Sequence, residues 1–294
     1  MSRNQNRTGQ PEDNFLHDDS PAPISTVGPG TGASSDAASF AWSVPTEFVD
    51  IPSAGRFYGP DHPLHNTTSV EIKFMTAKEE DILTSRSLLK EGVALDRMLQ
   101  NLLIDKAVQI DTLLVGDKNA LLVAARRTGY GPDYDTKVTC PSCGAHEEFS
   151  FDISNPPTNS YEQKIAEYGV GLTDNNTLIV KLPMTKATVE CRMLNGADEL
   201  RLYKEMERKA KKKDPTGTMT AAFRSYIVSV DGSPSPMVIE SFIQALPARD
   251  GRLLRNIYTE CIPNIDMTQD FECSNCSHST DMEVPLSADF FWPK

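Results

Sequence analysis

The pattern of apolar and polar positions divides the chain into a polar leading segment and an ordered body. Residues 1–43 are rich in Ser, Gly, Pro, Asp and Asn and carry few apolar side chains. Such a segment buries too little surface to offset the entropy lost on ordering. We therefore predict a disordered polar tail over residues 1–43, dispensable for folding, and regular structure from Val44 onward.

Residues 44–134 have the pattern of a strand followed by a small helical bundle. Apolar and polar residues alternate over residues 70–74, which predicts a half-buried strand. Thr76 and Glu79 then form a capping box, in which the Thr hydroxyl caps a helix and the Glu side chain reaches back. Apolar residues at helical spacing predict three helices, which end at Gly92, near Leu103 and at Gly129.

Residues 156–265 predict a β-hairpin and a helical insert. Two extended runs, residues 178–183 and 187–193, flank a short polar turn. Four apolar stripes at helical spacing follow. They centre on Tyr203, on Phe223 to Ile227, on Ile239 and on Leu254, the last entered through Pro247. Each stripe is explained by core packing.

Two C-x-x-C steps provide the strongest chemical signal. Cys140 and Cys143 form the first step and Cys273 and Cys276 the second. Each step lies between apolar-alternating segments, so each predicts a strand, a turn and a strand. Four thiolates presented by two such turns are the ligand set that a structural zinc ion prefers. The long excursion between them costs little, because loop-closure entropy grows only logarithmically with length.

These elements predict an α+β fold in which a helical bundle and a helical insert surround a split zinc ribbon. Its first half is assigned to residues 135–155 and its second half, with an aromatic C-terminus, to residues 266–294. One zinc ion per chain would bring residue 140 and the chain's end together, so we expect a single folding unit. His146 and His278 lie near the cysteines and are expected to stay out of the ligand set.

The remaining cysteines have simpler interpretations. A redox dithiol is an alternative for Cys140 and Cys143, but reactive pairs usually open a helix, and here the flanks are strands. Cys191 lies on an alternating strand and is expected to be a buried free thiol. Cys261 follows a helix and has no C-x-x-C partner.

Charge and motif content narrow the function. The chain has 29 Lys plus Arg and 41 Asp plus Glu, a net charge of −12, which disfavours nucleic-acid binding. The only dense cationic run, residues 208–213, is interpreted as the solvated end of a helix. No apolar run is long enough to cross a membrane. No phosphate-binding glycine loop, nucleophile elbow or zinc-protease helix occurs, so nothing supports an enzyme.

Three stretches resemble the baseplate hub protein family of T-even-type contractile-tailed bacteriophages. The first holds residues 51–58, 62–64 and 72–83; the second runs from Gly129 to Gly144; the third holds residues 263–266, 273–276 and 290–293. The resemblance implies a non-enzymatic protein that acts in hub assembly, as an assembly factor or a structural component. Its partners would be other hub or tail proteins, met in the host cytoplasm during assembly or in the virion tail baseplate.

Other classes of function stay open from the sequence alone. A nucleic-acid-binding zinc-ribbon protein of phage gene expression and a thiol-disulfide oxidoreductase are the two alternatives. For protein contacts, the aromatic run Phe290, Phe291 and Trp292 is the candidate surface, since aromatic residues dominate interface hot spots. The competing interpretation is that these rings pack on Phe149 and Phe151 and seal the ribbon.

Overall fold

The computed structural model describes residues 43–211, 218–284 and 288–291. The predicted tail, apart from its last residue, lies outside this part of the chain. The described residues from Ser43 onward form one unit that mixes helices with antiparallel sheets. The α+β class expected from the sequence is therefore confirmed at this level.

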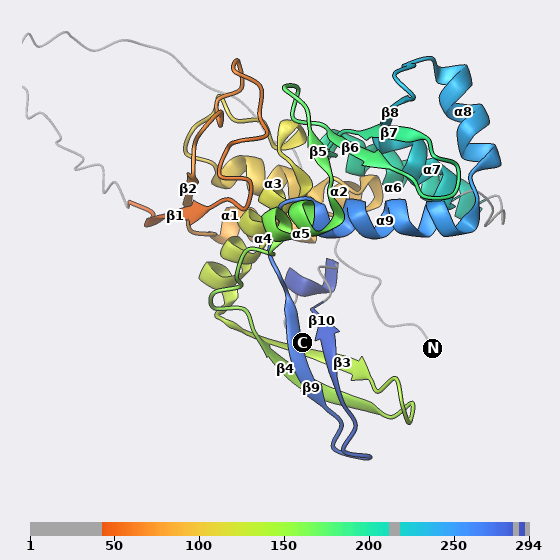
Figure 1. The fold of residues 1–294 in the computed structure, drawn as a ribbon. Helices are drawn as coiled ribbons and strands as arrows, with labels where there is room; N and C mark the ends of the chain where they lie inside the picture. Colours follow the sequence, from red (N-terminus) through yellow and green to blue (C-terminus); the bar gives the residue numbers. More distant parts are fainter. Residues whose placement is uncertain (1–42, 212–217, 285–287, 292–294) are drawn as a thin grey trace, which may run out of the picture. The chain divides into compact units, whose positions relative to one another are not determined.

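The N-terminal region is a two-stranded sheet followed by helices (Figure 1). Strand β1 (Thr46–Asp50) pairs antiparallel with β2 (Ser69–Lys73), and the connecting segment is a series of turns. The helices are α1 (Ala77–Thr84), α2 (Arg86–Glu91), α3 (Ala94–Leu102), the 3-10 turn η1 (Ile110–Thr112) and α4 (Val115–Tyr130). The predicted capping box is present: Glu79 Oε2 accepts hydrogen bonds from the Thr76 N–H at 3.0 Å and the Thr76 hydroxyl at 2.6 Å.

Two helix boundaries differ from the sequence prediction. The first predicted helix is broken at Ser85, whose backbone is extended, and α2 starts after it. Thr84 and Ser85 offer hydroxyl groups that compete for backbone partners, and the Thr84 hydroxyl indeed bonds back to Glu80 O. Gly129 does not end α4. The helix runs to Tyr130, and Gly131, with φ of 89°, is the residue that leaves it.

Two hairpins carry the cysteine pairs. Strand β3 (Asp133–Thr139) pairs with β4 (His146–Asp152), and β9 (Thr268–Glu272) pairs with β10 (Ser279–Glu283). Figure 1 shows them side by side although more than a hundred residues separate them in sequence. The short 3-10 helix η2 (Ala288–Phe291) follows the second hairpin.

The insert between the hairpins holds a four-stranded antiparallel sheet and five helices. The sheet order is β5 (Gly171–Leu172), β6 (Leu178–Lys181), β7 (Thr188–Cys191) and β8 (Ile227–Val230). The helices are α5 (Tyr161–Tyr168), α6 (Gly196–Lys211), α7 (Thr218–Tyr226), α8 (Pro236–Ala245) and α9 (Ala248–Cys261). In Figure 1, α5 and α9 lie next to one another.

Strand β8 was missed by the sequence analysis. The stripe assigned to one helix over Phe223 to Ile227 ends as a helix at Tyr226, and Ile227 begins a strand beside β7. The β-branched residues Ile227, Val228 and Val230 favour extended backbone. A short apolar run fits either periodicity, so the helical spacing was misleading here.

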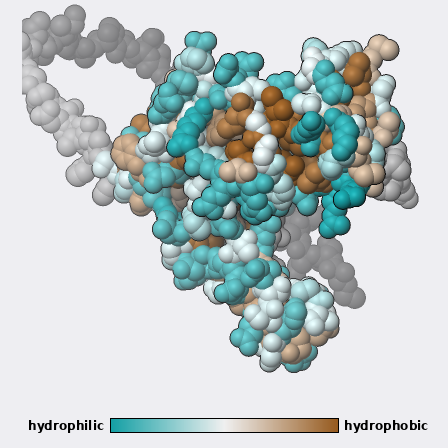
Figure 2. All heavy atoms as spheres, viewed as in Figure 1, coloured by the Kyte–Doolittle hydropathy of each residue, from teal (hydrophilic) through white to brown (hydrophobic). Residues whose placement is uncertain are grey.

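The buried side chains form two apolar clusters. The first core joins residues between Val49 and Ile153 to residues between Ile265 and Phe291. The second core draws only on residues between Val170 and Cys261. On the face shown in Figure 2, hydrophobic side chains gather where the small sheet lies beside α5 and α9, while charged and polar side chains cover most of the rest.

Candidate metal centre

The structure brings the four cysteines of the two C-x-x-C steps together. All four Sγ atoms lie within 4.8 Å of one another. Sγ of Cys140 is 3.8 Å from Sγ of Cys276, and Sγ of Cys143 is 3.7 Å from Sγ of Cys273. Disulfide sulfurs would be about 2.05 Å apart, so the cysteines are free thiols. A tetrahedron with zinc–sulfur bonds of about 2.3 Å has edges of about 3.8 Å, which matches both contacts.

The two cysteine turns have the same backbone geometry. The N–H of Cys140 donates to Ala145 O at 2.9 Å, and the N–H of Cys273 donates to His278 O at 3.0 Å. Gly144 and Ser277 stand at the same place in each turn, both with positive φ, and each donates its N–H back to the carbonyl of the first cysteine. In each turn the first cysteine is buried and the second exposed. The site is thus built from two equivalent half-sites.

Side chains around the sulfurs connect one turn with the other. Asn275 Nδ2 donates to Cys143 Sγ at 3.6 Å, across the two hairpins. Glu147 Oε2 accepts the N–H of Ser274 at 3.1 Å and also the Ser274 hydroxyl. The second oxygen, Glu147 Oε1, is buried without a partner among the described residues. Sequence reasoning did not find these residues, because a single Glu, Ser and Asn give no periodic or motif signal.

Cys143 and Cys273 differ strongly in pKa in the absence of a metal. A hydrogen bond from the Ala145 N–H and a second from the Asn275 side chain lower the pKa of Cys143 to about 6. Burial raises the pKa of Cys273 to about 12. A metal ion that binds Cys273 as a thiolate would therefore displace its proton, which makes the metal's affinity dependent on pH.

Aromatic and amide side chains support the site beneath the sulfurs. Phe149 lies edge-on to Phe151 and to Phe271, with ring centroids 4.8 and 5.3 Å apart, so aromatic packing joins the hairpins. Gln269 forms a reciprocal pair with the backbone of Asp152, accepting its N–H at 3.0 Å and donating to its carbonyl at 2.5 Å. These contacts hold β4 against β9.

Two of the three C-terminal aromatic residues, Phe290 and Phe291, are buried. Phe290 and Phe291 are each 1% exposed, so neither ring is accessible to a partner protein. Phe290 packs on Tyr134 with centroids 4.9 Å apart, and its carbonyl accepts Arg126 Nε at 2.8 Å. The aromatics therefore belong to the first core, although their ring contact is with Tyr134 and not with the expected Phe149 and Phe151. Trp292 lies outside the described residues.

The other candidate ligands stay outside the cluster. Thr139 Oγ1 lies 2.8 Å from His146 Nδ1, and His278 contributes backbone hydrogen bonds to the second turn, while neither imidazole belongs to the cysteine group. Cys191 and Cys261 are buried free thiols in the second core, as expected for Cys191. Of the basic run, Lys209 pairs with Glu205, and residues 212 and 213 lie outside the described part of the chain.

Comparison with known proteins assigns the chain to a family. The family model described as T4 bacteriophage base plate protein matches residues 47–292. Searches of curated proteins and of solved structures gave no match. Among the described residues, no helix combines the length and apolar character needed to cross a membrane. Because the match spans most of the chain, this protein belongs to the T4 bacteriophage base plate protein family.

Proposed function

We propose that this chain acts in assembly of the baseplate hub, without catalysis, by binding other hub or tail proteins. The observation that carries the proposal is the family match over residues 47–292. Its place of action would be the host cytoplasm during assembly and, if it is retained, the baseplate of the finished tail.

Binding is tested by co-expression with the other hub proteins of the same phage. The zinc-loaded full-length chain should co-purify with at least one of them at a fixed ratio. A chain that binds none of them, alone or in combination, would overturn the assembly role. Mass spectrometry of purified virions then separates a retained component from an assembly factor that leaves.

We further propose that the split ribbon binds one structural zinc ion through Cys140, Cys143, Cys273 and Cys276. Four sulfurs within 4.8 Å of one another form a ligand set that favours zinc over harder cations. All four positions are filled by protein, which is typical of a structural site. Protein purified without added zinc should contain about one equivalent by metal analysis, and a folded, metal-free chain would contradict the proposal.

The thiol oxidoreductase alternative makes a different chemical prediction. A redox pair would cycle between Cys140 and Cys143, but these two thiols contact Cys276 and Cys273 of the other turn. Both turns follow strands and not helix N-termini, where the dipole would favour a reactive thiolate. The zinc-loaded chain should therefore show no disulfide reductase activity.

A further inference from the structure

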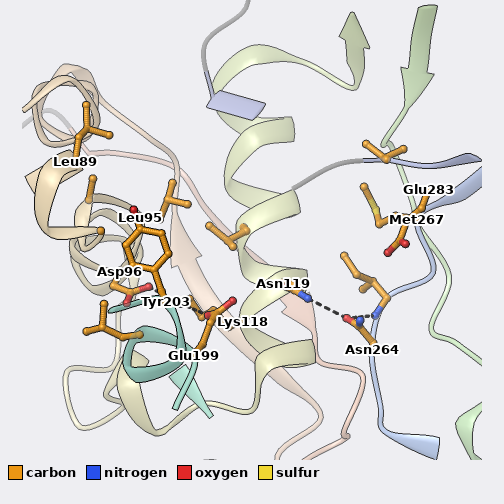
Figure 3. Close-up of a pocket in the computed structure, with 16 residues that line it drawn as sticks. Leu89, Leu95, Asp96, Lys118, Asn119, Glu199, Tyr203, Asn264, Met267 and Glu283 are labelled. Atoms are coloured by element: carbon orange, nitrogen blue, oxygen red, sulfur yellow. Dashed lines mark hydrogen bonds and ion pairs between the residues drawn. The ribbon is translucent and has the colours of Figure 1, made fainter. Parts of the chain in front are cut away.

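An open groove of about 720 Å³ lies along α4, and it is not part of the cysteine site. Its volume is in the range of sites that accommodate several side chains. Helix α4 forms the floor through Lys118, Asn119 and Leu122. Figure 3 shows the residues of α2, α3 and α6 on one side of this floor and the segment with Asn264 and Met267, together with Glu283, on the other.

The groove has an apolar lining that is partly open to solvent. Leu122, Ile265, Met267 and Val284 supply its buried apolar surface. At one side, Leu89 is 37% exposed and Tyr203 is 47% exposed. Tyr203 lies directly against Gly92, where any Cβ would come within 2.5 Å of the ring. A large exposed aromatic ring held in place beside an apolar hollow is typical of a protein contact site.

The charges around the groove favour a cationic partner. Lys118 is buried and its Nζ is shared by Asp96 Oδ1 at 2.6 Å and Glu199 Oε2 at 2.7 Å. Glu283 has no ion pair among the described residues. The lining therefore carries one positive and three negative groups, and Glu199 and Glu283 lie on opposite sides of the floor (Figure 3).

The amide pair in the middle of the groove offers polar contacts without charge. Asn119 Nδ2 donates to Asn264 Oδ1 at 3.2 Å, and that oxygen also accepts the Ile265 N–H. Asn119 Oδ1 and Asn264 Nδ2 have no partner within the described part of the chain. One free acceptor and one free donor at the floor suit a polar side chain or terminal backbone group of a peptide.

We propose that this groove binds an amphipathic, basic helix of another baseplate protein, with its apolar face on Leu122 and Tyr203 and its Lys or Arg residues facing Glu199 and Glu283. Helices that place apolar residues three, four and seven positions apart fit grooves of this kind. The net charge of −12 on the whole chain adds to the attraction. The inference rests on the proposed assembly role and names the surface that performs it.

The test uses the zinc-loaded full-length chain and a fluorescent 18-residue helical peptide of Leu and Lys, read by anisotropy. A peptide of the same composition in scrambled order should bind much more weakly. Tyr203→Ala should weaken binding of the amphipathic peptide roughly tenfold, as expected for an aromatic hot spot. Leu89→Ala should also weaken it, whereas Leu172→Ala, another exposed leucine outside the groove, should leave it unchanged.

A charge exchange gives the sharper result. Glu283→Lys should weaken binding of the Leu/Lys peptide and strengthen binding of a Leu/Glu peptide, while Glu272→Lys, on the neighbouring strand of the same hairpin, should do neither. Equal affinity for all variants would show binding to the acidic surface at large and overturn the proposal. A dimeric parent that Tyr203→Ala makes monomeric by light scattering would show that a second copy occupies the groove, which also overturns it.

The groove and the assembly role fail in different ways. If Tyr203→Ala and Glu283→Lys still co-purify with the hub proteins at the parent's ratio, the groove is not the contact surface and the assembly role stands. If the parent binds no hub protein, the assembly role fails whatever the peptides do.

Discussion

The two apolar cores of this chain are assembled from the sequence in different ways. The second core uses one continuous stretch, Val170 to Cys261, so its contacts are local in sequence. The first core joins residues 49–153 to residues 265–291, with the whole second core inserted between them. A discontinuous core needs contacts that hold its distant halves together, and the cysteine cluster, the Phe149–Phe271 contact and Arg126 all do so.

The difference explains where the cysteine cluster and its polar neighbours lie. Loop closure across the insert costs only slightly more than closure of a short loop. The halves of the first core must still find each other, and β3–β4 has no backbone pairing with β9–β10 in the described residues. Side chains and the proposed zinc ion therefore replace the backbone ladder that joins β6, β7 and β8 in the second core.

Removing the metal should separate the behaviour of the two cores most strongly. Zinc binding contributes on the order of 10 kcal/mol to folding of small zinc domains, so Cys273→Ser should lower the free energy of unfolding severely. Hydrogen exchange should show lost protection around Leu121 as well as Phe271, because both belong to the first core. Residues around Val189 and Leu254 in the second core should keep more of theirs.

A matched control separates loss of metal from the burial of a hydroxyl group. Cys261→Ser makes the same substitution at a fully buried thiol of the second core and should leave the zinc content at one equivalent. Equal loss of protection in both cores in Cys273→Ser would contradict the distinction, and an unchanged N-terminal bundle would contradict the joint first core.

The next largest expected loss of stability comes from a cavity-forming substitution in each core. Leu121 and Leu254 are both 0% exposed, one in each core. Leu121→Ala and Leu254→Ala should each cost about 2–5 kcal/mol in urea unfolding, from lost transfer energy and residual cavity. Only Leu121→Ala should speed zinc release to a coloured chelator. If Leu254→Ala speeds release as much, the cores are coupled more tightly than their composition indicates.

Much of this architecture was predictable because its signals are local. Capping at Thr76, the helical spacing of α3 and the hairpins around each C-x-x-C step all depend on a few neighbouring residues. The misplaced end of α4 at Gly129 and the missed strand β8 arose where a glycine or a short apolar run fits two structures. Tertiary contacts determine which of the two local structures forms: Met75 packs on Gly129, and β7 pairs with β8.

The cysteine cluster was predictable and its surroundings were not. Spacing alone identified the four cysteines, because two C-x-x-C steps carry a ligand geometry in their sequence. The Glu147–Ser274 contact and the groove over α4 depend on residues far apart in the chain, with no motif to connect them. The aromatic run at the C-terminus left two interpretations open, since composition does not say whether a ring is buried; Phe290 and Phe291 are buried in the structure.

Arg126 tests how the first core is closed at the chain's end. Its guanidinium donates to Phe290 O at 2.8 Å, Gly131 O at 3.0 Å and Asp133 O at 3.3 Å, and burial lowers its pKa. Arg126→Met keeps the apolar bulk but leaves three carbonyls without this donor, which should cost about 2 kcal/mol after relief of the buried charge. Thermal unfolding and carboxypeptidase digestion of the C-terminus measure the effect.

Two further substitutions serve as controls for Arg126→Met. Arg126→Lys should recover only part of the loss, because one ammonium cannot reproduce the planar fork that reaches three carbonyls. Arg127→Met removes a half-exposed neighbour that pairs with Glu47, and should cost below about 1 kcal/mol. Equal effects at positions 126 and 127 would show that Arg126 does not hold the C-terminal segment.

The smallest predicted effect compares one buried carboxylate from each region across pH. Burial alone would raise the pKa of Asp250, but hydrogen bonds from the N–H groups of Thr185 and Met184 and from the Thr185 hydroxyl outweigh it, so the pKa is lowered. Charged Asp250 therefore stabilises the fold above the unfolded pKa of about 3.9, and this contribution is lost as pH falls through the folded pKa. For Asp117 burial wins over the bonds from Ser53 and Tyr58, and the pKa is raised.

The two carboxylates should consequently give opposite pH slopes. The contribution of Asp117 is complete below the unfolded pKa and is lost as pH rises through its folded pKa. Asp250→Asn should lower the free energy of unfolding by about 1–2 kcal/mol at pH 7, because the single side-chain carbonyl of Asn replaces a carboxylate that accepts several hydrogen bonds. This difference should shrink as the pH falls towards 3 and the parent's carboxylate becomes protonated. The stability of the parent relative to Asp117→Asn should instead increase over the same fall in pH. The slopes are measured from the urea midpoints of the parent and both variants at several pH values between 3 and 7. Parallel slopes would contradict the prediction, because they would mean that the pKa values of Asp117 and Asp250 shift in the same direction on folding.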